Sequence, residues 1–414
     1  MLSATEQLHV IQSGDANIVP LEALKTKLES AIKEQRPLRC KLGVDPTAPD
    51  LHLGHAVPLR KLRQLQDLGH QVVLIIGNGT ALIGDPSGRN TTRPPLTPEQ
   101  IAINAQTYVS QAFKILDENK TELVYNGDWL KPLNLEGMLK LAAQFTVARI
   151  MERDDFSNRY KSGQTISLHE ILYPVMQAYD SVQVQADIEL GGTDQLFNLL
   201  AGRELMEKLG MEPQVCLTLP LLEGTDGVQK MSKSYGNYIG ITDEPIDMFG
   251  KVMSIPDSLM PRYLYLASDF PVEKSDELVR GLNDGTLHPN KVKRQLAASM
   301  VASYYDSKQA EGAEAAFDRV FKSNDEPDDI KGYTLAELAL QGVAPEGDGQ
   351  FYLPAVLVAV GLATTNSEAR RSIDGGGLKL AGVPVTKGTY SLPAQTLIGA
   401  TLQIGKRRWA KVLQ

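Results

Sequence analysis

Two short segments carry side chains suited to binding phosphate groups. The first runs Asp-Pro-Thr-Ala-Pro-Asp-Leu-His-Leu-Gly-His over residues 45–55, with His52 and His55 three positions apart. This spacing puts both rings on one face at the start of a helix, where backbone N–H groups and the helix dipole attract anions. Gly54 lacks a side chain, so a flat ligand can lie against the backbone. The segment therefore predicts a site for phosphate oxygens and a nucleoside.

Two other interpretations of this segment are a zinc site and an ordinary helix start. Zinc needs three or four ligands, and neither Cys40 nor Cys216 stands at ligand spacing from the histidines. No protein-bound metal is expected here. A helix start without chemistry stays open, because a His-x-Gly-His match is only moderately specific by itself.

The second segment is Lys-Met-Ser-Lys-Ser, residues 230–234, inside a loop from 223 to 237 that contains Gly224, Gly227 and Gly236. Two lysines three residues apart in such a loop suit a mobile clamp on a polyphosphate. The alternative is a solvated basic loop. The chain has neither a Walker-A pattern nor a Gly-x-Gly-x-x-Gly fingerprint, which disfavours ordinary P-loop NTPases and dinucleotide dehydrogenases.

The elements that must position these segments alternate between strand and helix patterns. Strands are expected at 38–44, 72–76, 123–125 and 182–186, and helices at 53–68, 98–116 (with Thr97 as N-cap) and 195–209. This alternation predicts an α/β fold, a doubly wound parallel sheet of the Rossmann-like kind, over residues 1–240. Ligands bind such sheets at the carboxyl ends of the strands.

The remainder of the chain divides by composition. Residues 241–325 are expected to form a helical domain, 326–350 an acidic linker rich in Pro and Gly, and 351–414 a small α+β module. The chain carries a net charge of −8, yet its last 64 residues hold eight basic and two acidic side chains. A basic module on an acidic body is typical of local phosphate binding. A basic tail that only improves solubility is the alternative.

Bulk composition limits the class of protein. With 414 residues, 42% of them hydrophobic and 22% charged, the chain is expected to be globular with two or three domains. Two cysteines cannot build a disulfide framework. We expect a soluble cytoplasmic protein without a membrane partner, because neither a signal peptide nor a run of ~18 apolar residues is visible.

The order His-Leu-Gly-His and then Lys-Met-Ser-Lys-Ser resembles the signature pair of class I aminoacyl-tRNA synthetases. Across essentially the whole chain, the sequence is similar to the bacterial tyrosyl enzymes of that class. The resemblance implies L-tyrosine, tRNA(Tyr) and ATP as substrates, with Mg²⁺ chelated to the ATP, and a homodimer. It also implies a set of catalytic residues, namely Thr47, His52, His55, Lys230, Lys233 and Ser234.

The same resemblance assigns the substrate contacts. For ATP it implies Gly54, Gly192, Asp194 and Lys233, of which Gly192 and Asp194 serve the ribose. For tyrosine it implies Thr80, Asp85, Asn126, Tyr173, Gln177, Asp180 and Gln195. Asp85, Tyr173 and Gln177 would hold the α-ammonium group, and Asp180 would accept the phenolic hydroxyl. Tyr173, Gln177 and Asp180 are spaced by four and three residues, which places them on one helix face; without the family, this is simply a polar face.

One position departs from the family pattern. Many bacterial tyrosyl enzymes carry a tyrosine just after the first strand as a second partner of the phenol, and here the residue is Lys41. Lys41 either pairs with a nearby carboxylate or faces away from the pocket.

The C-terminal module resembles the ribosomal S-four type of RNA-binding fold over residues 366–382. Its candidate RNA-binding residues are Arg370, Arg371, Lys406, Arg407 and Arg408. Two rival interpretations are a tryptophanyl synthetase, which would need neither Asp180 nor the basic C-terminal module, and an RNA-binding protein on a degenerate synthetase scaffold. Both signature segments are intact, which argues against the second rival.

Overall fold

The structure is a computed structural model that describes residues 2–47, 50–86, 96–319, 330–347, 349–405 and 408–413. By its internal contacts the chain divides into two compact units, residues 1–311 and residues 312–414. The first contains a six-stranded sheet and the second a five-stranded one. Within the described residues, none of the helices combines the length and apolar character that crossing a membrane requires.

The sheet of the first unit has the order β1-β6-β5-β2-β3-β4. Its strands are β1 (Asn17–Val19), β2 (Arg39–Val44), β3 (Gln71–Ile76), β4 (Thr121–Tyr125), β5 (Ile188–Gly192) and β6 (Val215–Leu219). All neighbours are parallel except β1, which pairs antiparallel with β6. The chain runs outward from β2 to β3 and β4, and later fills the other side with β5 and β6. The doubly wound α/β fold is thus confirmed, with its switch point between β2 and β5.

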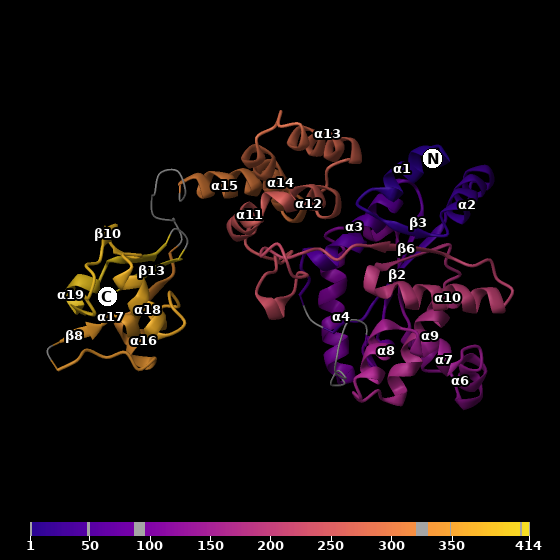
Figure 1. The fold of residues 1–414 in the computed structure, drawn as a ribbon, viewed down its shortest axis with the longest axis horizontal. Coiled ribbons are helices and arrows are strands. Elements are labelled where there is room, and N and C mark those ends of the chain that lie inside the picture. The colour runs from indigo at the N-terminus through magenta and orange to yellow at the C-terminus, as the bar shows by residue number, and fades with distance from the viewer. Residues whose placement is uncertain are drawn as a thin grey trace. The chain divides into compact units, whose positions relative to one another are not determined.

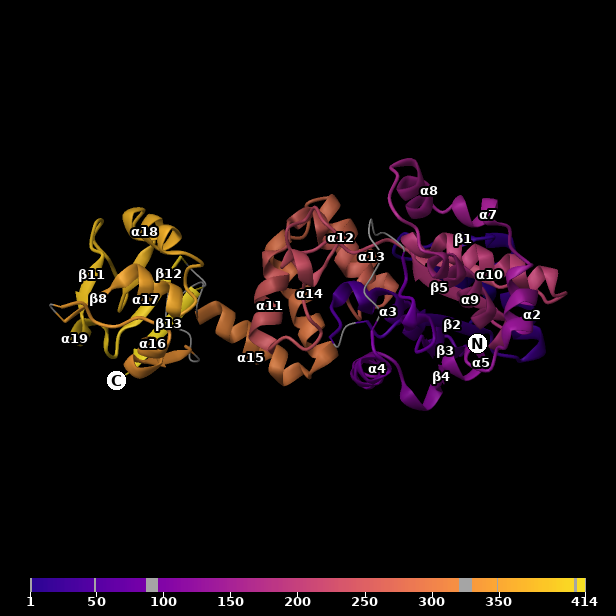
Figure 2. The same cartoon turned by 90° about the horizontal axis from the view of Figure 1, so that it is seen from below.

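Helices cover both faces of this sheet. In Figure 1, α3 (Leu53–Asp67) lies on one side of the sheet and α9 (Leu168–Gln183) and α10 (Leu196–Lys208) on the other. The leucines of α3 at 53, 59, 62 and 65 are fully buried and recur at helical spacing, which explains why this segment packs on the sheet. Figure 2 gives the same elements from below.

The remaining elements of this part are mostly short. They are α1 (Ala4–Gln12), α2 (Leu21–Glu34), η1 (Thr80–Leu82), α4 (Pro98–Ala112), η2 (Glu118–Lys120), α5 (Gly127–Leu130), α6 (Leu135–Ala142), α7 (Val147–Met151), α8 (Asp154–Lys161), η3 (Thr193–Gln195) and η4 (Lys233–Tyr235). Thr97 caps α4 as expected, because its hydroxyl accepts from the backbone N–H of Gln100.

One strand prediction was wrong. Residues 182–186 are not a strand, because α9 continues to Gln183 and a turn follows, closed by hydrogen bonds from Val184 N to Asp180 O and from Ala186 N to Ser181 O. The alternating sequence Val-Gln-Val-Gln-Ala is typical of a strand, but these residues form the end of α9 and the turn after it. The strand of this region is β5, two residues further on.

A helical segment follows, as expected from 241 onward. Its elements are α11 (Pro245–Ser254), η5 (Asp257–Leu259), α12 (Met260–Leu266), α13 (Val272–Asn283), α14 (Pro289–Tyr304) and α15 (Ser307–Asp318). Helices α11 and α14 form its central contact.

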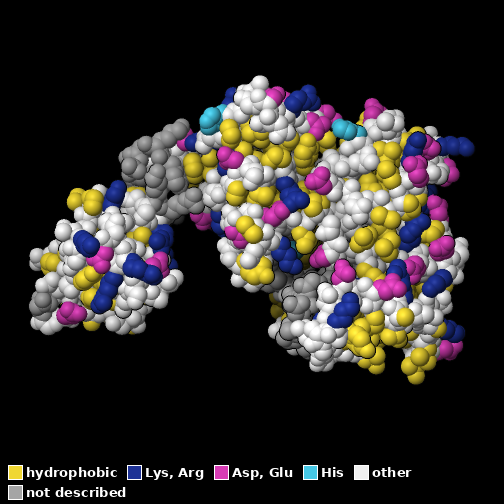
Figure 3. All heavy atoms as spheres, in the orientation of Figure 1, with side chains coloured by type: hydrophobic (Ala, Val, Ile, Leu, Met, Phe, Trp, Pro, Cys, Tyr) yellow, Lys and Arg dark blue, Asp and Glu magenta, His cyan; other side chains and the backbone are white. Residues whose placement is uncertain are grey.

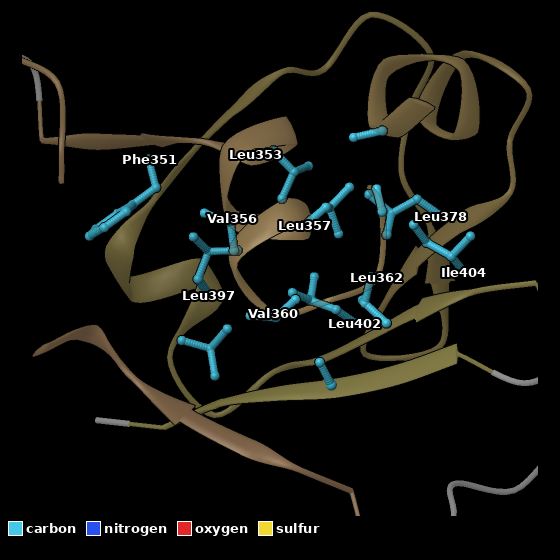
Figure 4. Packing of buried hydrophobic residues seen from close by; sticks show 14 of the residues in the cluster. Phe351, Leu353, Val356, Leu357, Val360, Leu362, Leu378, Leu397, Leu402 and Ile404 are labelled. Carbon is cyan, nitrogen blue, oxygen red and sulfur yellow. The ribbon is translucent and has the colours of Figure 1, made fainter. Parts of the chain in front are cut away.

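The C-terminal unit is a small α+β module. Its elements are β7 (Gly332–Thr334), α16 (Leu335–Leu340), β8 (Gln350–Tyr352), α17 (Leu353–Ala359), α18 (Asn366–Asp374), β9 (Leu378–Leu380), β10 (Val383–Pro384), β11 (Ser391–Pro393), α19 (Ala394–Leu397), β12 (Thr401–Ile404) and β13 (Arg408–Leu413). Figure 4 shows its core, where side chains from α17, α19 and the strands, such as Val356, Leu397 and Leu402, converge.

The expected linker, 326–350, differs from the structure in its second half. Strand β7 pairs parallel with β13, and Leu338 of α16 is fully buried in the module's core. The short apolar pattern Tyr-Thr-Leu-Ala-Glu-Leu at residues 333–338 was overlooked because the residues around it are acidic and rich in glycine. The folded module therefore begins near residue 332.

Candidate active site

A cavity of about 710 Å³ opens at the carboxyl ends of β2, β3, β5 and β6. This is the edge of a doubly wound sheet where ligands are expected. Its lining includes nearly every site residue that the sequence suggested, namely Thr47, His52, Gly54, His55, Thr80, Asp85, Asn126, Tyr173, Gln177, Asp180, Gly192, Asp194, Gln195, Lys230 and Ser234. Lys233 is the exception, since it does not line the cavity.

The two histidines open α3 as a stacked pair. Their ring centroids are 3.8 Å apart, and the backbone N–H of His52 lies 3.4 Å from Nδ1 of His55. Burial, with smaller effects from His55 and Lys233, lowers the pKa of His52 to about 3. Burial and the nearby Lys233 lower the pKa of His55 to about 4. Both rings are thus neutral at pH 7, so they can donate N–H bonds to phosphate oxygens without carrying charge.

Hydrogen bonds join the histidine segment to the residues that directly follow the lysine loop. The backbone N–H of Leu53 donates to Ile239 O (2.9 Å), and that of Ile241 donates to Leu51 O (3.2 Å). A side chain on Gly54 would have its first carbon only 3.0 Å from Cε1 of His52 and 3.7 Å from Cβ of Met231. Gly54 therefore leaves room for the His52 ring, whereas the contact with Met231 would be an ordinary one.

The lysine loop, residues 223–237, is braced at its base and open at its tip. Asn237 accepts from the backbone N–H of Ser232 (2.8 Å) and donates to Asp226 (2.8 Å). At the tip, Lys233 Nζ lies 2.8 Å from Oδ2 of Asp50, with the two side chains 36% and 53% exposed. The Lys233 ammonium is therefore held by a surface carboxylate at the cavity mouth.

Asp180 marks the closed end of the cavity. Its carboxylate is 3% exposed and accepts from Nε1 of Trp129 (2.8 Å) and from Nδ2 of Asn126 (3.2 Å). Burial raises the pKa of Asp180 to about 6, against the opposing influence of Lys41 and these two donors. The group is mostly ionised at pH 7, and it presents a charged acceptor at the end of an otherwise enclosed space.

A second carboxylate, Asp45 at the end of β2, lies further along the same cavity. It accepts from the hydroxyl of Thr80 (2.6 Å) and from that of Tyr173 (3.0 Å). Burial, and next Asp45, raise the pKa of Tyr173 well above its usual value, so this phenol stays protonated. A side chain on Gly77 would have its Cβ 2.1 Å from Oδ1 of Asp45, so only glycine fits there.

Asp85 and Gln195 form a linked pair above the helix start of α10. Gln195 donates to Asp85 (2.6 Å) through Nε2 and accepts from Asn198 (3.0 Å) through Oε1. Arg153 in turn donates to Asn198 (3.1 Å). These partners fix the Gln195 carboxamide. Asp85 lines the cavity and is also ion-paired with Arg153, whose Nη2 lies 3.8 Å from Oδ1 of Asp85.

Gly192 and Asp194 lie where β5 ends and η3 begins. A Cβ on Gly192 would lie 2.6 Å from Oδ1 of Asp194, which explains the glycine. Burial and the nearby Asp85 raise the pKa of Asp194, while Lys230 acts in the opposite sense. A carboxylate beside an exposed backbone suits a contact with vicinal hydroxyl groups.

Lys41 pairs with a carboxylate, which decides between the two alternatives left open by the sequence. Its Nζ lies 3.1 Å from Oε1 of Glu189 and donates to Ser181 (2.6 Å). Both members of the pair are 1% exposed and lie between the sheet and α9.

Sequence reasoning missed Asp45, Trp129 and Glu189. Two signals were present. Trp129 stands three residues after Asn126, so a helical turn places both on one face. Glu189 interrupts the apolar run of β5, and a carboxylate in a buried strand requires a partner. Asp45 begins the histidine segment, but its partners come from residues far away in sequence.

On the basic module, α18 exposes both Arg370 and Arg371. Arg370 donates to the hydroxyl of Tyr352 (2.6 Å) and lies over the rings of Tyr352 and Tyr390. Arg408 is ion-paired with Glu368 (3.1 Å). The other two candidates, Lys406 and Arg407, lie outside the described residues.

Comparison with known proteins agrees with this geometry. Residues 33–322 match the family described as tRNA synthetases class I (W and Y). The tyrosine–tRNA ligase of Carboxydothermus hydrogenoformans is 47% identical over 408 residues, 98% of this chain and 97% of that protein. That of Burkholderia lata is 50% identical, covering 98% and 94%.

Solved structures agree as well. The Archaeoglobus fulgidus tyrosyl-tRNA synthetase complexed with L-tyrosine superposes with a TM-score of 0.60 at 26% identity, covering 74% of this chain and 99% of that one. A truncated mitochondrial enzyme from Aspergillus nidulans gives 0.63 at 21% identity, covering 78% and 95%, and supports the fold alone. The chain therefore belongs to the class I tRNA synthetases of the tryptophan and tyrosine type, within the tyrosine–tRNA ligase branch.

Proposed function

We propose that the chain is a cytoplasmic tyrosine–tRNA ligase that activates L-tyrosine with ATP and then transfers the tyrosyl group to the 3′ end of tRNA(Tyr). In the first step a carboxylate oxygen of tyrosine bonds to the α-phosphorus, and the bond to pyrophosphate breaks. The carboxylate is ionised at pH 7, so no general base is needed. Catalysis then consists of positioning and of stabilising charge on the phosphate oxygens.

The tyrosine substrate fits the closed end of the cavity. Asp180 accepts the hydrogen bond of the phenol, and Asp85, Tyr173 and Gln177 take the α-ammonium group at the other end. Thr80, Asn126 and Gln195 line the space between. Asp45, which the sequence did not suggest, orients the Tyr173 hydroxyl by accepting from it.

ATP, with its chelated Mg²⁺, fits the open end. Thr47, His52 and His55 serve the α-phosphate side as neutral donors, and Gly54 gives the base room. Gly192 and Asp194 take the ribose. On the far side, Lys230, Lys233 and Ser234 attract the leaving pyrophosphate, with Lys233 exchanging Asp50 for a phosphate oxygen. The described residues contain no cluster of three metal-binding side chains, and the metal enters as part of the substrate.

The single observation that carries this proposal is the buried Asp180 carboxylate at the end of a cavity that both signature segments also line. A charged acceptor there favours a phenolic hydroxyl over the side chain of phenylalanine, which has no donor to offer it. Pyrophosphate exchange with tyrosine, phenylalanine and tryptophan tests the point. Exchange with tyrosine alone is expected, and preferred exchange with tryptophan would refute the assignment.

The C-terminal module is proposed to bind tRNA, beginning near residue 332 and preceded by the helical domain. Its exposed Arg370 and Arg371 suit phosphate contacts. Arg371→Glu should raise the KM for tRNA by roughly tenfold and leave pyrophosphate exchange unchanged, because reversing one charge loses phosphate contacts. Lys33→Glu, the same charge change at the exposed end of α2, is the control. Unchanged charging by Arg371→Glu would remove this helix from the interface.

A homodimer is proposed from exposed apolar side chains on the helices after β4. Leu135, Leu139, Val147 and Leu168 are 61–78% exposed. Figure 3 shows hydrophobic side chains on the surface in the region where Figure 1 draws α6 and α8. Such a patch is typical of an interface. Sedimentation should give twice the chain mass of 45.2 kDa, and Leu139→Glu should reduce it to the single-chain value.

A further inference from the structure

The ion pair of Lys41 and Glu189 lies directly behind the proposed tyrosine pocket. Both side chains are 1% exposed, with Nζ and Oε1 3.1 Å apart. Removing two charges from water is costly, and their attraction often no more than offsets that cost. Stability alone is therefore a weak reason for a lysine and a glutamate on the central strands of a sheet, and the neighbours of the pair indicate another.

Glu189 collects four donors around its two oxygens. Besides Lys41, it accepts from Ser181 Oγ (2.8 Å), from Gln214 Nε2 (2.9 Å) and from Gln177 Nε2 (3.2 Å). Gly202 of α10 makes room for them, because its added Cβ would lie 2.6 Å from Gln214 and 2.9 Å from Ser181. The carboxylate thus ties β5 to α9 and β6.

The contact with Gln177 sets the orientation of a substrate-binding side chain. A carboxylate only accepts hydrogen bonds, so Gln177 must direct its NH₂ group toward Glu189. The carboxamide oxygen is then the atom available as an acceptor for an ammonium group. Turned the other way, the side chain would present a donor to the substrate cation. Glu189 therefore selects the productive rotamer of Gln177.

Lys41 acts on the opposite end of the pocket, through Asp180. Its Nζ donates to Ser181, the residue after Asp180 on α9. Four groups from other parts of the chain face Asp180: Lys41 on β2 favours its ionised form, Glu189 on β5 opposes it, and Trp129 and Asn126 donate hydrogen bonds to it. On α9 itself, the charge of Asp180 acts on the phenol of Tyr173.

We propose that the Lys41–Glu189 pair is a positioning device for tyrosine, in which Glu189 orients Gln177 toward the α-ammonium group and Lys41 keeps a positive charge behind Asp180, so that one carboxylate suffices to recognise the phenol. Neither residue touches the reacting atoms. The inference rests on the proposed function, and wild-type pyrophosphate exchange with tyrosine tests that function separately from the variants below.

Lys41→Met keeps the length of the side chain and removes its charge. It should lower the ratio of kcat/KM for tyrosine over phenylalanine by roughly tenfold at pH 7, because an unbalanced Glu189 disfavours the ionised form of Asp180. The ratio should recover as the pH is raised toward 9, where Asp180 ionises again. A merely structural loss would not be restored by base.

Glu189→Gln should behave differently. The new amide can face either way, so Gln177 loses its fixed orientation, while Lys41 still favours the charge on Asp180. The KM for tyrosine and for phenylalanine should rise together by roughly three- to tenfold, with the ratio undiminished, because both amino acids share the ammonium group. The KM for ATP should change less than twofold in both variants, as ATP contacts neither residue's partners.

Lys27→Met is the matched control, since Lys27 is also buried and pairs with Glu212 (2.7 Å) on another part of the unit. It should alter none of the amino-acid parameters. If either single variant fails to fold, the uncharged double variant Lys41→Met/Glu189→Gln tests the proposal in its place. It should combine raised KM values for both amino acids with a ratio near that of the wild type.

Three outcomes would overturn the proposal. They are a wild-type ratio in Lys41→Met at pH 7, a ratio that stays low at pH 9, and an increase of the ATP KM as large as that for tyrosine. For the double variant, wild-type KM values for both amino acids would do the same.

Discussion

The two ends of the active-site cavity are built in opposite ways. At the closed end, Asp180 is 3% exposed and Asn126 1%, and each polar atom of this group has its partner before a substrate arrives. At the open end, the lysine loop carries Lys233 on an exposed tip, where it pairs with the half-exposed Asp50 and lies over the ring of Tyr238. One end is buried and fully hydrogen-bonded, while the other carries an exposed ion pair.

This difference assigns different tasks to the two ends. A buried carboxylate with fixed donors discriminates among substrates that already fit, because only a substrate with a donor can add a charge-assisted hydrogen bond to it. An exposed lysine contributes little to a resting complex, but it can follow charge that moves onto pyrophosphate. The closed end should therefore govern amino-acid selectivity and the open end the rate of activation.

The largest expected effect is at the open end. Lys233→Ala should lower the rate of tyrosyl-adenylate formation by roughly 10²-fold or more, with little change in the KM for tyrosine, because one charge-assisted contact to the transition state is worth ~2–4 kcal/mol. Lys251→Ala is the control, since Lys251 lies over the same Tyr238 ring but belongs to α11 and pairs with Asp243. An unchanged single-turnover rate in Lys233→Ala would show that Lys233 does not stabilise the transition state of activation.

A smaller effect is expected from Trp129, the indole donor to Asp180. Trp129→Phe should lower kcat/KM for tyrosine by about three- to tenfold and affect phenylalanine less, because Asn126 remains as a donor to the carboxylate. The other tryptophan of the chain, Trp409, lies in the C-terminal module and provides the control Trp409→Phe. Equal losses for both amino acids would mean that the indole only fills space.

The pH dependence should separate the two ends as well. The pKa of Asp180 is raised to about 6, so this group is ionised above that pH and protonated below it. The pKa values of His52 and His55 lie near 3 and 4, and both rings stay neutral throughout. Between pH 7.5 and 5.5, kcat/KM for tyrosine should fall roughly fourfold. The same acid limb with phenylalanine would show that another group titrates.

The smallest effect concerns the partner of Lys233. Asp50→Asn removes an exposed ion pair, a contact worth ~0–1 kcal/mol, and frees Lys233 for phosphate. The KM for ATP should fall about twofold, because Lys233 is then free of its competing partner. A rise in this KM would indicate that Asp50 contributes to ATP binding itself.

Local sequence patterns predicted the helices and many of the residues that line the cavity. These features depend only on the spacing of residues within one element. The leucine period marked α3 to within one residue of its end, and the spacing of Tyr173, Gln177 and Asp180 placed all three on one side of α9, where they line the cavity. The family and the α/β class are confirmed by the relatives and by the sheet. The chemical roles of these residues stay predictions.

The sequence could not predict contacts between side chains that are far apart along the chain and that only the fold brings together. Lys41 and Glu189 are 148 positions apart, and only the neighbouring places of β2 and β5 in the sheet make them a pair. Trp129 and Asp180 are 51 positions apart, and no local pattern predicts the hydrogen bond between them. The false strand at 182–186 has a local cause, since a two-residue alternation of Val and Gln fits both a strand and the last turn of a helix.

The most direct test of the account is the selectivity of Asp180→Asn, measured as the ratio of kcat/KM for tyrosine over phenylalanine beside the wild type. The amide keeps the shape of the side chain but removes the charge that makes the hydrogen bond strong, a loss of ~1.5–3 kcal/mol for tyrosine. Phenylalanine never makes this bond and should lose nothing. We predict that the ratio falls by at least about tenfold. A ratio equal to that of the wild type would show that Asp180 does not recognise the phenol, and would contradict the assignment of the closed end.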